Sequence, residues 1–131
     1  MSVLLWSLFA AALLVVLSKG PAMKYMAQSS GGYDNRHPRE QQSQLSGPGA
    51  RALAAHQNTI ENFPLFAAGV LVAELAANPN TVTALLAVGF LVMRVAYIVC
   101  YVKDWSTPRS VVWGLGYFAC LGLLLAPLYA G

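Results

Sequence analysis

Residues 1–18 read MSVLLWSLFAAALLVVLS and residues 110–131 read SVVWGLGYFACLGLLLAPLYAG, and neither stretch contains a charged side chain. Each is long enough to cross a bilayer core of about 30 Å at about 1.5 Å per residue. These stretches therefore predict a membrane-spanning helix at each end of the chain. Residues 1–18 lack a basic start and a small-residue cleavage pattern, so we expect a retained helix rather than a signal peptide.

Two further apolar stretches lie between these ends, and both contain polar side chains. Residues 52–77 and 80–103 are joined by Asn78-Pro79-Asn80, a short turn that makes the two helices antiparallel neighbours. The fold class that follows is an all-α integral membrane four-helix bundle, formed by residues 1–131 as one domain. The expected spans are about 2–26, 52–77, 80–103 and 110–130.

The composition agrees with a membrane protein. Hydrophobic residues make up 57% of the chain and charged residues 10%, whereas soluble domains carry about 25% charged residues. This balance excludes a disordered tail, a disulfide-stapled secreted module and a nucleic-acid reader. Cys100 and Cys120 lie within apolar runs, and the two histidines, His37 and His56, lie in unlike surroundings, so no disulfide or metal site is expected.

Residues 28–49 (QSSGGYDNRHPREQQSQLSGPG) are rich in Gly, Ser, Gln and Pro and predict an irregular polar loop. Lys and Arg flank this first loop and the third, whereas the second loop and both termini have none. The positive-inside rule then places loops one and three in the cytoplasm and both termini on the opposite side, an arrangement that suits a bacterial inner membrane. The basic residues are Lys19, Lys24, Arg36, Arg39, Arg51, Lys103 and Arg109.

Two ionisable residues of opposite sign, Glu61 and Arg94, interrupt the middle spans. Each costs about 2.5–3.5 kcal/mol to insert into a bilayer, so an intramembrane charge indicates a functional site. Counted from Arg51 and Asp104, both lie about 15 Å below the cytoplasmic surface. One interpretation is a buried ion pair that only locks the two helices together.

A second interpretation is a polar cavity open to the cytoplasm. Asn58 and Glu61 share one helix face, and Arg94, Tyr97 and Tyr101 form a stripe on the next helix. Together with Gln57 and Arg109, these residues offer more polar groups than one ion pair needs.

The same residues resemble the MAPEG family, the membrane-associated proteins in eicosanoid and glutathione metabolism. The segment 51–66, RALAAHQNTIENFPLF, resembles the polar block of that family's second helix. Arg94-x-x-Tyr97-x-x-x-Tyr101, followed by Arg109-Ser110, resembles its third helix and the start of its fourth. The chain departs from the family pattern at Ala54, where leukotriene-forming relatives carry an arginine, and at Gln57, where prostaglandin-forming relatives carry a basic residue.

The resemblance implies a homotrimer that binds glutathione at each subunit boundary. Arg109 would stabilise the glutathione thiolate, because a nearby cation favours ionisation of a thiol. Arginine suits the two carboxylates of the tripeptide, and glutamate suits its ammonium group. The residues expected to bind glutathione are Arg51, Gln57, Asn58, Glu61, Arg94, Tyr97 and Tyr101.

Three functions follow as hypotheses. The leading one is a transferase or peroxidase that uses glutathione on a lipophilic small-molecule substrate arriving from the membrane lipids. The second is a non-catalytic lipid-binding or scaffold protein of the same family, a reading that Ala54 favours. The third is a small multidrug transporter with an intramembrane glutamate, against which stand the position of Glu61 in the second helix and the opposed Arg94.

Overall fold

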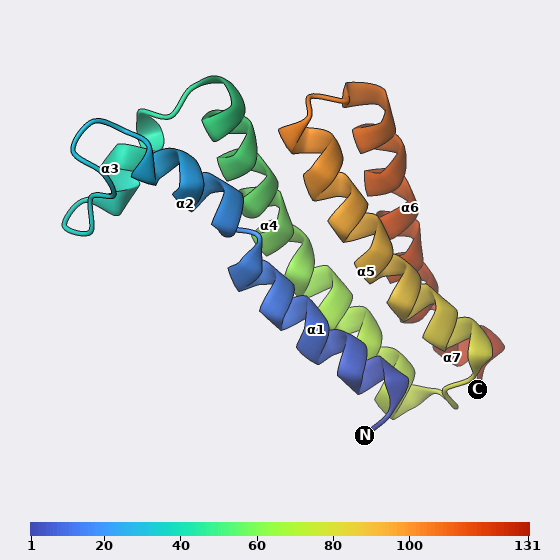
Figure 1. The fold of residues 1–131 in the computed structure, drawn as a ribbon. Helices are drawn as coiled ribbons and strands as arrows, with labels where there is room; N and C mark the ends of the chain where they lie inside the picture. The colour runs from blue at the N-terminus through green and yellow to red at the C-terminus, as the bar shows by residue number, and fades with distance from the viewer.

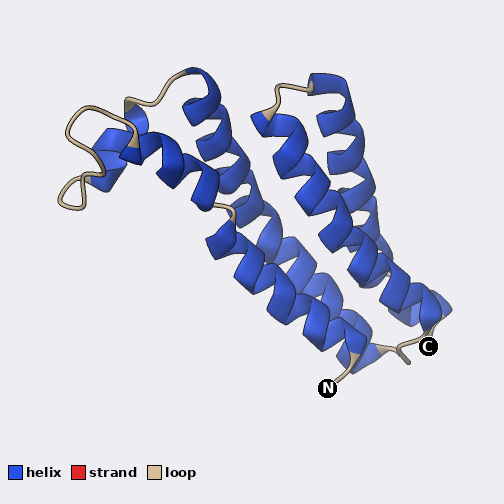
Figure 2. Cartoon of the chain, in the orientation of Figure 1, coloured by secondary structure: helices blue, strands red, loops and turns tan.

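The computed structural model describes all residues 1–131, and they fold into helices and short connections with no strand (Figure 2). This confirms the predicted all-α class. The helices are α1 (Val3–Leu17), α2 (Gly20–Ala27), α3 (Pro38–Ser43), α4 (Gly47–Ala76), α5 (Thr81–Val102), α6 (Ser106–Leu124) and α7 (Ala126–Tyr129).

The four long helices lie side by side in an elongated bundle (Figure 1). Helix α4 contacts α1, α5 and α6, and α6 packs most extensively against α5. Both termini lie at one end of the bundle, while α3 and the α5–α6 connection lie at the other (Figure 1). The basic residues of the first and third loops therefore gather at a single end.

Three helical stretches are long and apolar enough to cross a membrane: Val3–Ala27, Gly47–Ala76 and Thr81–Val102. Helix α6 is not among these three, and its first turn is the polar run Ser106–Ser110, which includes Arg109. The expected fourth span, 110–130, is divided between α6 and α7 at Leu125, just before Pro127. Proline at the start of α7 fits a new helix because its missing N–H is not needed there.

A close-packed apolar core holds the bundle together. Phe66 of α4 stacks on Phe90 of α5 with ring centres 4.1 Å apart. Gly69 lets α4 approach α6, since a Cβ at this position would lie 3.0 Å from the Leu123 Cβ. Small residues at such crossings allow membrane helices to pack closely. Cys120 is fully buried in this core. Cys100 is also buried, outside the core, and both cysteines are free thiols.

The first expected span is interrupted. Residues 2–26 form α1 and α2 with a break at Ser18 and Lys19. The Ser18 hydroxyl donates to the Val15 carbonyl oxygen at 2.8 Å and lies 2.8 Å from His56 Nδ1. Because that hydroxyl has a single hydrogen, His56 Nδ1 is the donor in the second bond. The break is thus attached to α4.

The polar segment before α4 differs from the expected irregular loop over 28–49. It contains the short helix α3, and α4 begins at Gly47 rather than at 52. Asp34 Oδ1 accepts the backbone N–H groups of Arg36 and His37 just before Pro38 begins α3. Composition alone overlooks these local start signals, which satisfy backbone donors and fix φ.

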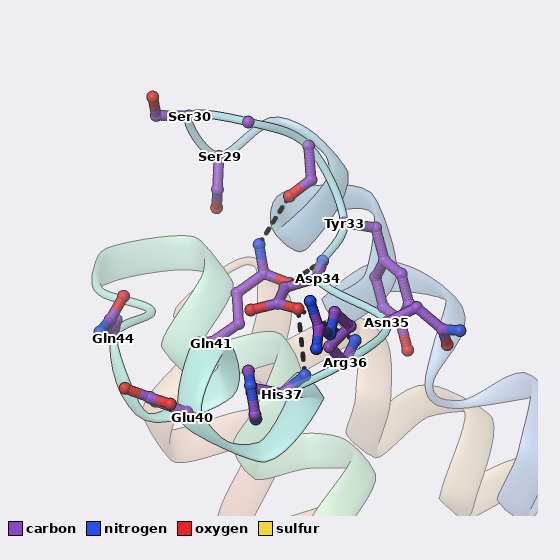
Figure 3. Close-up of a pocket in the computed structure, with 12 residues that line it drawn as sticks. Ser29, Ser30, Tyr33, Asp34, Asn35, Arg36, His37, Glu40, Gln41 and Gln44 are labelled. Atoms are coloured by element: carbon purple, nitrogen blue, oxygen red, sulfur yellow. Dashed lines mark hydrogen bonds between the residues drawn. The ribbon is translucent and has the colours of Figure 1, made fainter.

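Gln41 of α3 organises the rest of that segment. Its side chain points into the preceding loop (Figure 3), where its amide nitrogen donates to the carbonyl oxygens of Gly32 and Met26 at 2.8 and 3.2 Å. Its amide oxygen accepts the Asp34 N–H at 2.9 Å. A wide polar hollow of about 800 Å³ lies between this loop and α3. The segment is therefore an ordered cap at one end of the bundle.

Candidate functional site

Arg94 lies at the centre of the polar region, between α5 and α4. Its side chain is 3% exposed. Nη1 donates to Asn58 Oδ1 at 2.9 Å, and Nη2 donates to Thr59 Oγ1 at 3.0 Å. Both acceptors are neutral, so the guanidinium has no carboxylate among its hydrogen-bond partners within the chain. Its Nε is buried without a hydrogen-bond partner.

The two acceptors are held in place by further hydrogen bonds. The Thr59 hydroxyl donates to the Ala55 carbonyl oxygen at 2.8 Å. Asn62 donates from its side-chain nitrogen to the backbone oxygen of Asn58 at 2.9 Å and to Asn58 Oδ1 at 3.0 Å. Asn58 Oδ1 therefore accepts from two donors, which fixes the direction of its amide group.

Two arginines and two tyrosines form a continuous row from α5 to α6. The Arg94 Cζ lies 4.3 Å from the centre of the Tyr97 ring, and the Arg109 Cζ lies 4.5 Å from that of Tyr101. The two tyrosine rings meet edge to face at 5.7 Å. Guanidinium groups are attracted to aromatic faces, so the row positions Arg109 through Tyr101.

A cavity of about 250 Å³ opens beside this row, between α4, α5 and α6. It presents an amide, a phenol, a guanidinium, a hydroxyl and an indole. Its volume lies below the roughly 300–1,000 Å³ of most ligand pockets, so the cavity formed by this chain is small. The lining residues are Asn58, Tyr97, Arg109, Ser110 and Trp113.

Glu61 lies outside this arrangement. It is exposed on α4 and forms no ion pair with Arg94, whose hydrogen bonds go to Asn58 and Thr59. Two residues that lie at the same depth in the bilayer therefore need not be in contact. At about 100° per residue, Glu61 lies about 200° around the helix from Thr59, which faces α5. Of the two interpretations of Glu61 and Arg94, the ion pair that locks the helices together is therefore not the one that the structure has.

Comparison with known protein families matches residues 3–129 to the MAPEG family. The chain belongs to the MAPEG family. The match spans nearly the whole sequence and confirms the resemblance seen in the two polar blocks. Together with the three apolar helices, membership identifies an integral membrane protein of a family with glutathione-related transferase, peroxidase or related functions. Comparison with curated proteins and with solved structures gives no match.

The remaining two predicted residues of this MAPEG protein lie away from the cavity. Gln57 is exposed and lines a separate hollow of about 70 Å³ on another side of α4, together with Lys19, Arg39 and His56. Arg51 lies two turns before Asn58, and its Nε is buried without a partner. The structure therefore gathers five of the eight predicted residues: Asn58, Arg94, Tyr97, Tyr101 and Arg109.

Two residues that contribute to the cavity and to the contacts of Arg94 were not singled out from the sequence. Thr59 accepts from Arg94, and Trp113 lines the cavity. Spacing offered a signal for each, because Thr59 adjoins Asn58 and Trp113 lies four residues after Arg109, on the same helix face. Threonine and tryptophan are both common in membrane helices, so their presence at these positions did not by itself indicate a site.

Proposed function

We propose that this MAPEG protein is a membrane-embedded, glutathione-dependent transferase or peroxidase that acts on lipophilic electrophiles or lipid hydroperoxides. The observation that supports this most directly is the cavity in which Arg109 lies beside Tyr97 and Asn58. A cation next to a phenol and an amide suits an anionic sulfur that must be held near other polar groups of the same ligand.

The chemistry of the donor set fits glutathione. Arg94 and Arg51 each have a buried Nε without a hydrogen-bond partner, and a buried donor of this kind costs about 1–3 kcal/mol when unsatisfied. Glutathione carries two carboxylates, which are acceptors that suit guanidinium groups. Arg94 and Asn58 would therefore hold one charged end beside the cavity, and Arg51, two turns before Asn58 and outside the cavity, would hold the other where the ligand extends along α4.

The exposure of Glu61 supports the proposed homotrimer. This residue lies near the middle of α4, a helix long enough to span a membrane, yet its side chain is exposed in the single subunit. A charge at such depth is costly if it faces lipid. A second subunit, or the ammonium group of glutathione bound between subunits, would cover it.

We place the loops that contain α3 and Trp105 on the cytoplasmic side and α6 as the fourth span.

Bound glutathione supplies a thiol whose ionised form is a strong nucleophile. Arg109 favours that ionised form by its charge, and Tyr101 holds the Arg109 guanidinium from below through its ring. Tyr97, whose ring contacts Arg94, lines the cavity, and its hydroxyl would donate a hydrogen bond to the bound ligand. In conjugation by substitution a sulfur–carbon bond would form while the leaving group departs with its bonding electron pair, and in addition to an activated alkene the π bond would break and the neighbouring carbon would take up a proton. In peroxide reduction two thiols would convert one hydroperoxide into an alcohol, water and a disulfide.

The test is a titration of glutathione into the detergent-purified protein, followed by the ultraviolet absorbance of the thiolate. We expect a saturable signal in the wild type, no signal in Arg109→Ala and a weaker signal in Glu61→Gln. Arg36→Ala is the matched control, because it removes an exposed arginine of the 28–46 segment, away from the cavity.

Turnover gives the second readout. Full activity of a folded Arg109→Ala variant toward several electrophiles would overturn the proposed mechanism. Absence of any thiolate signal in the folded wild type would overturn glutathione use altogether and favour the lipid-binding function.

A further inference from the structure

We infer that Trp113 forms the surface on which the second substrate binds, and that this surface selects planar aromatic electrophiles over flexible aliphatic ones. The inference rests on the proposed function and adds a substrate class to it. It comes from the position of Trp113 on α6, between the cavity and a second aromatic ring.

Trp113 joins the cavity to an aromatic row along α6. Together with Arg109 and Ser110 it lines the cavity. Tyr117, one turn further along the helix, stacks on the indole with ring centres 5.3 Å apart and planes within 10°. Phe118 meets Tyr117 edge to face at 6.0 Å. The row runs from the polar cavity toward the apolar middle of α6.

The indole is partly accessible, and one of its faces is stacked on a neighbouring ring. Trp113 is 39% exposed. Tyr117 covers one face of the ring, and Arg109 and the cavity lie in the opposite direction along α6. A flat, electron-rich face beside a cation is suited to a flat, electron-poor ring, because offset stacking adds to the gain from burial. A flexible chain gains only the burial and must lose more conformational entropy to lie there.

The position of Arg109 would bring the thiolate close to a ring that stacks on Trp113. The guanidinium that favours the thiolate lies one turn before Trp113 on the same helix. In a chloronitroarene the sulfur would bond to the ring carbon that carries chlorine, and chloride would leave with the carbon–chlorine electron pair. The thiol proton passes to water. Because the step replaces chloride by the thiolate, it needs no oxidant or reductant.

An alternative role for Trp113 is an ordinary anchor at the membrane surface. Other large apolar residues of α6, Val111, Leu115 and Phe118, are also exposed. None of these three lines the cavity. Leu115 is therefore a matched control position, because it is an exposed apolar residue of the same helix.

The first experiment compares Trp113→Leu, Trp113→Phe and Leu115→Ala with the wild type. The substrates are 1-chloro-2,4-dinitrobenzene, which is planar, and trans-2-nonenal, which is flexible. We expect Trp113→Leu to lower kcat/KM about three- to tenfold for the arene, as loss of one aromatic pair implies. The enal should change by less than about twofold, Trp113→Phe should restore most of the arene rate, and Leu115→Ala should change neither ratio.

The second experiment measures binding without turnover. A variant with Trp6→Phe and Trp105→Phe leaves Trp113 as the only tryptophan, and its fluorescence is followed while 1,3-dinitrobenzene, which has no leaving group, is added. We expect saturable quenching. A variant that keeps only Trp6, which is 57% exposed on α1, should show unsaturable, collisional quenching.

The outcomes separate this inference from the proposed function. If the wild type gives the thiolate signal and turns over both substrates, but Trp113→Leu lowers both rates equally or lowers neither, the inference is wrong and the proposed function stands. Unsaturable quenching of Trp113 would also overturn it. If the folded wild type gives no thiolate signal, both the proposed function and the inference fail.

Discussion

Thr59 is the smallest of the groups that hold Arg94, and its replacement tests how a buried guanidinium is stabilised here. Thr59→Val keeps the shape of the side chain but removes the oxygen that accepts from Arg94 Nη2 at 3.0 Å. An unsatisfied buried donor costs about 1–3 kcal/mol, and more when it is charged, so we expect the free energy of unfolding to fall by about 3 kcal/mol. Unfolding in mixed micelles, followed by circular dichroism, measures the difference.

Thr59→Ser is the control for this prediction, because it keeps the hydroxyl. A double-mutant cycle with Arg94→Met isolates the contact, since Thr59→Val should cost much less once the guanidinium is gone. Equal costs of Thr59→Val in both backgrounds would show that the hydrogen bond adds nothing to stability.

At the scale of single residues, the sequence predicted which polar side chains lie in the same region but not which of them are in contact with one another. Counting residues gave the depth of Glu61 and Arg94 in the bilayer, and depth is one coordinate only. The rotation of α4 about its axis turns Thr59 toward α5 and leaves Glu61 exposed. That rotation is set by packing contacts such as the close approach at Gly69, which a single sequence does not reveal.

At the scale of the elements, α3 and its loop depend on one side chain. Gln41 makes three hydrogen bonds that tie α3 to Gly32, Asp34 and the end of α2. Gln41→Leu removes them, so we expect local opening and faster trypsin cleavage after Arg36. Loss of only about 1.4 kcal/mol of local stability corresponds to a tenfold faster cleavage when opening precedes it. Peptide mass spectrometry follows the rate.

Gln44→Leu is the matched control, because Gln44 is exposed at the end of the same short helix and its side chain forms no hydrogen bond there. Its cleavage rate should equal that of the wild type. Equal rates in Gln41→Leu and Gln44→Leu would contradict the role given to Gln41, and they would indicate that α3 is held by other contacts.

The elements that the sequence predicted best are those with long apolar runs. Helices α4 and α5 were expected at 52–77 and 80–103, and the structure begins α4 only five residues earlier. The short elements were missed because their signals are local: Pro38 at the start of α3, and the break at Ser18 that divides α1 from α2. The amino-acid composition of a long segment does not show such single-residue signals.

At the scale of the whole molecule, the single subunit leaves polar groups on a face that lipid does not suit. Glu61 and Gln57 lie one turn apart on the exposed face of α4, while Asn58 faces the cavity. Composition and periodicity cannot count subunits, so the trimer that we propose rests on the family resemblance and on this uncovered face. If a neighbouring subunit covers it, Gln57 of one chain would serve the cavity of another.

Mixed oligomers test that arrangement. Arg109→Ala and Gln57→Leu subunits, each weak in glutathione binding alone, are co-expressed in equal amounts and purified through two different tags. Purification through both tags keeps only trimers that contain both variants. In such a head-to-tail ring one of the three boundaries pairs an intact Arg109 with an intact Gln57, so we expect about a third of the wild-type thiolate signal per site. If both residues act within one subunit, every site lacks one of them, and the mixture should bind no better than its parents. A signal at the parental level would therefore contradict a site shared across the boundary.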